Sequence, residues 1–127
     1  MKTLTVFGIF LSVLAITSKA QQKKQPEDTC CCTTYDTGQC LIKVKASVDT
    51  DLDNTYQKAL KRWSEPELNA ALRKAQNAWV GYRDANCDAE LATYGRGTMG
   101  PNMWAFCRIR LTRQRIAEIT NVYLSEH

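Results

Sequence analysis

The chain has little of what an enzyme site needs, beginning with histidine, since His127 is the only one it contains. Histidine is the side chain whose ordinary pKa suits acid–base work near neutral pH. No cysteine–histidine pair, activated serine or Cys-x-x-Cys knuckle stands out in the sequence. We therefore expect no catalytic residue, no metal and no cofactor. Zinc remains open as an alternative at the four cysteines Cys30, Cys31, Cys32 and Cys40.

Long apolar runs are also missing, except for one near the N-terminus. Met1-Lys2 is a positive start, residues 4–16 are almost all apolar, and small residues precede Ala20. A run of about 13 residues is too short for a stable bilayer span and has the layout of a signal peptide. We predict a signal peptide at 1–20, cleaved near Ala20, and hence a periplasmic or secreted protein. An uncleaved anchor is the alternative.

The chain has only a small excess of positive over negative charge. The formal net charge is +4, and loss of the two lysines of the leader would lower it to about +2. On a mature chain of about 107 residues, enough for one domain, so weak and scattered a charge does not indicate a nucleic-acid partner. No later apolar run reaches membrane-spanning length, so we expect no membrane span in the mature chain.

Cysteine, by contrast, is abundant, with six residues in a small chain predicted to be exported. Such chains usually form disulfides, although six cysteines allow fifteen pairings. We predict a flexible, cysteine-rich N-terminal segment at 21–39. One or two of its three adjacent cysteines would reach Cys40 or another helix, and a bond between two molecules is the alternative.

Helical periodicity dominates the predicted domain, residues 40–127. A first helix is predicted at about 51–63, with an earlier start left open, because apolar residues recur at three- and four-residue steps: Leu52, Tyr56, Ala59, Leu60 and Trp63. Acidic residues cluster near its start. They favour helix capping over a calcium site, because the glycine and terminal glutamate of a calcium loop are missing.

A second helix is predicted from Pro66 to about Tyr94. Ser64 is expected to cap it, with Glu67 completing a capping box and Pro66 in the first turn. Its apolar stripe consists of Leu68, Leu72, Ala75, Trp79 and Tyr82. At helical spacing, one flank of this stripe carries Gln76, Arg83 and Cys87.

A third helix follows the glycine-rich connection at 95–101. Asn102 is expected to cap it, and it should run to about Leu124. Its apolar side consists of Phe106, Ile109, Ile116, Ile119 and Tyr123. With no convincing strand, the chain is predicted to be all-α, a small up-down bundle of three or four helices.

Two cysteines flank the connection between the last two predicted helices. Cys87 lies about eight residues before the end of one helix and Cys107 about five after the start of the next, or roughly 12 and 8 Å from the turn. In antiparallel neighbours these heights permit a disulfide. Closing about 20 residues would add on the order of 3 kcal/mol of stability. The geometry thus suits a disulfide-stapled helical hairpin.

Three segments together resemble the family of the lysozyme inhibitor LprI N-terminal domain. They read Leu52-Asp53-Asn54-Thr55-Tyr56, then Ala75-Gln76-x-Ala78-Trp79-x-x-Tyr82-Arg83-Asp84-x-x-Cys87, then Cys107 followed by Leu111-Thr112-Arg113-Gln114-Arg115. The resemblance covers about 40–124 and implies an all-helical extracytoplasmic protein, a Cys87–Cys107 disulfide and inhibition of lysozyme. The Cys-Cys-Cys run departs from the family pattern, as does the lack of a lipid-attachment cysteine.

The residues of the middle segment are expected to be structural: Gln76, Trp79, Tyr82, Arg83 and Asp84. Trp79 and Tyr82 lie on the apolar stripe and should pack in the core. Arg83 should be a partly buried anchor paired with an acid on the first helix, because arginine stays protonated and no nucleophile lies beside it. Gln76 should satisfy buried polar groups.

Exposed contact residues are predicted at and just after the glycine-rich connection, namely Arg96, Met99 and Trp104, with a simple flexible connection as the alternative. An arginine on a pre-ordered loop suits the acidic cleft of a muramidase. We therefore predict an exported cell-envelope binding protein, not an enzyme, that resembles a lysozyme inhibitor and binds lysozyme or another envelope protein. A structural or adaptor protein of the bacterial envelope is the alternative.

Overall fold

The computed structural model describes residues 25–30 and 33–126, so the predicted leader, 1–20, lies outside the described residues, as do Cys31 and Cys32. Three long helices make up most of the described chain, which contains no strand. They are α1 (Thr34–Arg62), α2 (Pro66–Ala92) and α3 (Gly100–Ile119), with a 3-10 turn before them (Pro26–Thr29) and a π-helical turn after them (Thr120–Leu124). The predicted all-α class is confirmed.

The first helix, α1, begins much earlier than predicted. A capping box starts it: the Asp36 N–H donates to Thr33 Oγ1 at 3.1 Å, and the Thr33 N–H donates to the Asp36 carboxylate at 3.4 Å. Gly38 lies inside this helix where α3 passes close, and a Cβ there would stand 3.0 Å from the Asn102 side chain. The approximate start at residue 51 is therefore replaced by an earlier start, which the sequence left open. Residues 34–39, expected to belong to the flexible segment, form its first turns.

The second helix, α2, has the predicted proline in its first turn but not the predicted cap. Pro66 fits there because its missing N–H would have no partner inside the helix. Glu65, and not Ser64, is the capping residue, and its side chain makes no capping hydrogen bond. Asn69 holds the turn instead, since its Nδ2 donates to the Trp63 carbonyl at 2.7 Å. A side chain from inside α2 therefore stabilises the connection between α1 and α2.

Both ends of α3 are fastened to α1. Asn102 was expected to cap α3, but it lies buried in its first turn, where its Nδ2 donates to the Thr34 carbonyl at 3.0 Å. At the other end, Trp63 Nε1 donates to the Tyr123 carbonyl of the π-helical turn at 2.8 Å. This bond satisfies one of the carbonyls that a helix end leaves open. The start and end of α3 are therefore tied to the start and end of α1.

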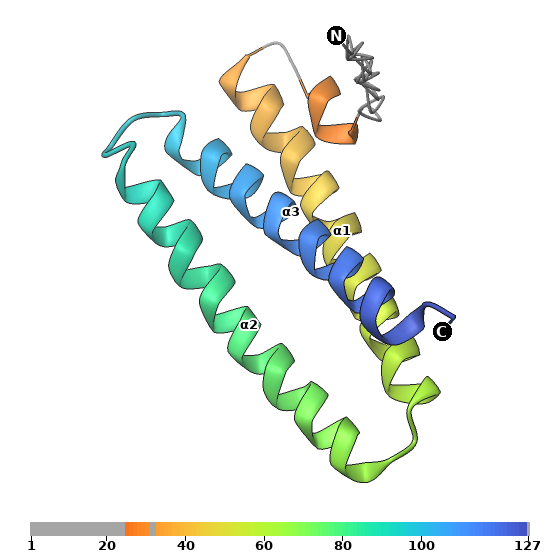
Figure 1. The fold of residues 1–127 in the computed structure, drawn as a ribbon. Coiled ribbons are helices and arrows are strands. Elements are labelled where there is room, and N and C mark those ends of the chain that lie inside the picture. The colour runs from red at the N-terminus through yellow and green to blue at the C-terminus, as the bar shows by residue number, and fades with distance from the viewer. Residues whose placement is uncertain (1–24, 31–32, 127) are drawn as a thin grey trace, which may run out of the picture.

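The helix α3 is the centre of an up-down bundle (Figure 1). It lies along both other helices, whereas α1 and α2 make hardly any close backbone approach to each other. The buried apolar residues form three clusters, which consist of Leu52, Ala59, Leu60, Leu72 and Ile119; Leu41, Val48, Ala105 and Ile109; and Cys87, Cys107 and Leu111. Because α2 adds only Leu72 and Cys87 to these clusters, other contacts must help to hold it.

Two disulfides join elements that the chain brings together. Cys87 of α2 is bonded to Cys107 of α3, with both residues buried and their Cα atoms 5.6 Å apart. This is the pair that the family resemblance implies. Cys30 is bonded to Cys40, which attaches the 3-10 turn to α1. A zinc site built on Cys30 and Cys40 is thereby excluded, because their sulfurs are not free thiolates.

Candidate functional site

The inward face of α2 combines part of its apolar stripe with its polar flank. The buried residues of α2 are Leu72, Gln76, Arg83 and Cys87. Tyr82 is 57% exposed, so the expectation that it packs in the core is wrong. Tyrosine is the more apolar side chain, but an arginine can be buried in its place when its charge is paired. The polar residues of the middle segment therefore mark the face that packs against α3.

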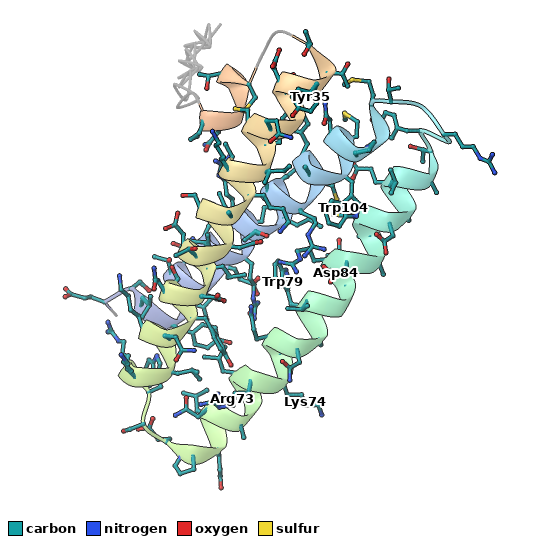
Figure 2. All side chains as sticks on the ribbon, turned by 180° about the vertical axis from the view of Figure 1, so that it is seen from behind. Tyr35, Arg73, Lys74, Trp79, Asp84 and Trp104 are labelled. Carbon is teal, nitrogen blue, oxygen red and sulfur yellow. A yellow bond between two sulfur atoms is a disulfide. The ribbon has the colours of Figure 1, made fainter. Side chains whose placement is uncertain are left out.

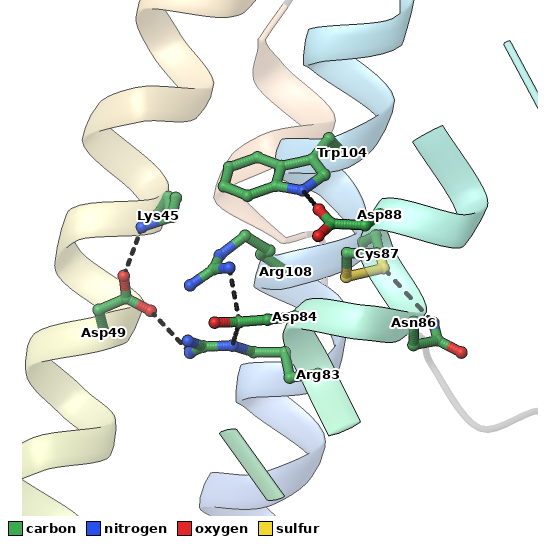
Figure 3. Close-up of polar contacts among 10 residues, drawn as sticks. Lys45, Asp49, Arg83, Asp84, Asn86, Cys87, Asp88, Trp104 and Arg108 are labelled. Carbon is green, nitrogen blue, oxygen red and sulfur yellow. Dashed lines mark hydrogen bonds and ion pairs between the residues drawn. A yellow bond between two sulfur atoms is a disulfide. The ribbon is translucent and has the colours of Figure 1, made fainter. Parts of the chain in front are cut away.

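An ion-pair network lies in the middle of the bundle and joins all three helices (Figure 3). Arg83 Nε donates to Asp84 Oδ1 at 2.9 Å, and Arg108 Nη1 of α3 donates to the same oxygen at 2.6 Å. Arg83 Nη1 also lies 3.7 Å from Asp49 Oδ1 of α1, and the other Asp49 oxygen accepts from Lys45 at 2.7 Å. The expected pairing of Arg83 with an acid on the first helix is present. It links α1 to α2, whose backbones hardly approach each other.

Trp79 packs beside two buried arginines. The guanidinium carbons of Arg83 and Arg115 lie 5.1 and 5.9 Å from its ring centroid, within cation–π range. Arg115 Nε donates to Gln76 Oε1 at 3.0 Å, and Arg115 Nη1 lies 2.9 Å from the Glu118 carboxylate. Figure 2 shows Trp79 and Asp84 extending from α2 toward the other helices. The glutamine and the tryptophan thus help to accommodate a charge inside the fold.

This network is suited to holding helices together and not to acid–base chemistry. Asp49 and Asp84 are each held by two cations, and arginine stays protonated near neutral pH. In the described ranges, no group of three or more metal-ligating side chains comes together. The same ranges contain no helix of the length and apolarity needed to cross a bilayer.

A polar groove of about 920 Å³ lies between α1 and α3 below the 3-10 turn. Its lining mixes both charges with uncharged side chains, namely Gln25, Pro26, Lys43, Val44, Ser47, Val48, Asp51, Asn54, Thr55, Lys58, Arg113 and Ile116. Partial burial lowers the pKa of the Arg113 guanidinium from its ordinary value. Arginine remains charged at neutral pH all the same. Such a mixture of charged, polar and apolar groups singles out no class of ligand.

The loop end of the bundle, where α2 turns into α3, carries two of the three predicted contact residues. Arg96 is exposed in the turn, which Gly95 permits by adopting a left-handed backbone with φ of 57°. Met99 is 44% exposed, and its sulfur accepts a hydrogen bond from Thr34 Oγ1 at 3.9 Å. The turn therefore contacts the start of α1, which the sequence did not indicate because the predicted first helix began too late.

The third predicted contact residue, Trp104, lies within α3 and is half-buried. Its Nε1 donates to Asp88 Oδ1 of α2 at 2.9 Å, and the Arg108 guanidinium carbon lies 4.6 Å from its ring centroid. Trp104 also lines an apolar groove of about 360 Å³ that involves all three helices, together with Gly38, Ile42, Lys45, Leu91, Pro101, Asn102 and Ala105. Trp104 therefore contributes to a groove beside the turn and not to the turn itself.

Comparison with known proteins shows what the chain is similar to. The family model described as lysozyme inhibitor LprI matches residues 18–119, a range that includes α1, α2 and α3 in full. An uncharacterized protein of Rhizobium meliloti (strain 1021) is 31% identical over 123 residues, with 86% of this chain and 88% of that protein covered. No solved structure matches. The family match extends further toward the N-terminus than the resemblance seen in the sequence, and it includes the cysteine-rich segment.

Proposed function

This chain belongs to the lysozyme inhibitor LprI family, and from that membership we propose that it is an exported protein that binds and inhibits a lysozyme. The two disulfides support export, because such bonds persist in oxidising compartments outside the cytoplasm. The apolar N-terminal run supports it too, as a leader cleaved near Ala20. Mass measurement of the protein recovered from outside the cytoplasm tests this part, since an intact N-terminus would contradict it.

The observation that carries the inhibitory proposal is an exposed arginine on a turn that is held in place. Arg96 lies in the connection between α2 and α3, which the Cys87–Cys107 bond fastens together. Met99, on the same connection, is hydrogen-bonded to the start of α1. A turn that is already ordered loses less conformational entropy on binding than a free loop.

The chemistry of a muramidase cleft is complementary to such a turn. Glycoside hydrolases of this kind carry a pair of carboxylic side chains beside the scissile bond. We propose that Arg96 enters this cleft and pairs with a carboxylate, while Met99 makes apolar contact with the cleft wall. The chain itself then needs no catalytic residue. In keeping with that role, the ion pairs of the network join helices.

Replacement of the turn arginine tests the proposed contact. Arg96→Ala should weaken inhibition about tenfold in a turbidity assay of cell-wall lysis, which is the loss typical of one interface arginine. Arg73→Ala is the matched control, because Arg73 is an exposed arginine in the first half of α2, far from the turn (Figure 2). Equal inhibition by the two variants would remove Arg96 from the contact surface.

An envelope adaptor without inhibitory activity is the second candidate, and one observation favours it. Four residues of the middle segment, Gln76, Trp79, Arg83 and Asp84, make contacts within the bundle. Their presence is explained by the stability of the fold alone and gives no information about a binding partner. Purified mature protein mixed with several lysozymes separates the two candidates, because full lytic activity in every mixture would favour the adaptor.

A further inference from the structure

We propose that the apolar groove beside the turn receives a lysine or arginine side chain of the bound lysozyme, with its charge against Asp88. This inference rests on the proposed function and adds a second contact to it. Arg96 would be the cation that this chain offers to the lysozyme cleft. The groove would hold a cation that the lysozyme offers from the rim of that cleft.

The shape and lining of the groove suit the stem of a long side chain. Its walls come from Ile42 of α1, Leu91 of α2 and Trp104 of α3, and its volume of about 360 Å³ leaves room for the stem of a long side chain. Lysine and arginine bury their methylene groups along apolar surfaces while the charged head stays near water. An indole ring is also a favourable surface for a guanidinium or an ammonium group.

Asp88 supplies the charge that such a side chain would need. Its carboxylate accepts one hydrogen bond, from Trp104 Nε1 at 2.9 Å, although a carboxylate has room for about four. Asp49 and Asp84 are each held by two cations, but Asp88 has no ion pair within the described part of the chain. Asp88 and Leu91 are three residues apart on α2, so both face the same side of that helix.

The cation already in the groove is engaged elsewhere. Lys45 lines the groove, but its Nζ lies 2.7 Å from Asp49 Oδ2. Arg108 approaches Trp104 and donates to Asp84 at 2.6 Å. The exposed Asp88 is thus an acidic group near the groove that neither Lys45 nor Arg108 pairs with.

The surroundings of the groove favour a protein as its occupant. Ile42 is 60% exposed and Tyr35, seven residues earlier on α1, is 73% exposed, so apolar surface continues beyond the groove. Apolar side chains beside a charged group are typical of protein contact surfaces. The net charge of this chain is small and positive, which by itself would not attract a basic lysozyme. A local acidic group would still allow such binding, because association depends on the charges that face each other more than on the net charge of each protein.

Two variants of exposed residues test the groove without disturbing the core. Asp88→Asn removes the charge but keeps an oxygen that can accept from Trp104, and Ile42→Lys places a cation at the groove wall. Each should weaken the Kd for a basic lysozyme about tenfold, measured by titration calorimetry. The matched controls are Asp53→Asn, an exposed acid of α1, and Val122→Lys, an exposed aliphatic residue of the π-helical turn. Both controls should bind like the original protein.

The outcomes separate this inference from the proposed inhibition. If the original protein inhibits lysozyme and the two groove variants bind as tightly as their controls, the groove is not a contact site. If it binds lysozyme through Asp88 but does not slow lysis, the groove stands and the inhibitory function falls. If no lysozyme binds, both are overturned. Circular dichroism should show unchanged helix content in every variant.

Discussion

At the scale of single residues, Asp84 accepts hydrogen bonds from Arg83 of its own helix and Arg108 of α3. Both arginine side chains are largely buried, whereas the Asp84 side chain is 43% exposed. Removing a carboxylate leaves a buried cation short of a partner, and this costs more than the ion pair itself contributes. Partial exposure of Asp84 to water reduces that cost.

We predict that Asp84→Ala lowers the free energy of unfolding by about 1–2 kcal/mol, measured by urea denaturation. Asp53→Ala is the control, because it also replaces an exposed aspartate inside a helix and removes no ion pair found in the described chain. The two substitutions gain the same helix propensity, so the difference between them reports the network. A difference near zero would mean that the network contributes nothing to stability.

Residue by residue, the sequence was most informative about Gln76 and Arg83 and least about Tyr82. Gln76 was expected to satisfy a buried polar group, and it accepts a hydrogen bond from Arg115. Arg83 was expected to be a partly buried anchor paired with an acid on the first helix, and it is buried beside Asp49. Tyr82 was assigned to the core from its place on the apolar stripe, yet it is exposed. Hydrophobicity ranks side chains one at a time, whereas the burial of an arginine depends on a partner from another helix.

At the scale of helices, the Cys87–Cys107 bond joins α2 and α3 across a closed stretch of 20 residues. Replacing both cysteines with serine should lower the free energy of unfolding by about 3 kcal/mol, because the unfolded chain regains the entropy of that loop. Thermal unfolding followed by circular dichroism measures the change. The Cys30→Ser/Cys40→Ser pair is the comparison, since that bond closes a shorter stretch outside the hairpin.

The hairpin variant also connects stability to the proposed function. Inhibition should fall in the fraction that remains folded. The helices on either side of the turn that carries Arg96, α2 and α3, are then no longer joined by a disulfide, so the turn is less well ordered. Full inhibition by the folded double-serine protein would show that the staple is not needed to hold the turn.

Some helix ends could be predicted from the sequence and others could not. The proline start of α2 and the end of the last helical turn at Leu124 were predicted, since proline and apolar spacing are local signals. The start of α1 was missed, although Thr33 and Asp36 stand in the spacing of a capping box. The cysteine run and Gly38 obscured that signal, and Gly38 is explained only by the nearness of α3.

At the scale of the whole molecule, α3 supports two helices whose backbones hardly approach each other. In the first half of α2, residues 66–78, the buried side chains are those of Leu72 and Gln76. The second half is held by the disulfide and the ion-pair network. Segments with few buried contacts open locally at lower free energy than the centre of a fold.

We therefore predict faster amide hydrogen exchange in residues 66–78 than in the interior of α3, measured by mass spectrometry at neutral pH. The second half of α2 serves as the internal control and should be protected nearly as well as α3. Uniform protection along α2 would contradict the arrangement in which α3 is the main support. Added lysozyme should increase protection at the loop end and leave residues 66–78 nearly unchanged.

The sequence by itself determined the all-α class and the family, because helical periodicity and the spacing of the signature are properties of neighbouring residues. Only the tertiary structure decided which face of α2 turns inward and that Cys30 is bonded to Cys40. It also decided that Ile42 and Trp104 line one groove and that Asp88 is hydrogen-bonded to Trp104. These three residues come from three helices, and distances between helices depend on packing, which no local pattern in the chain encodes.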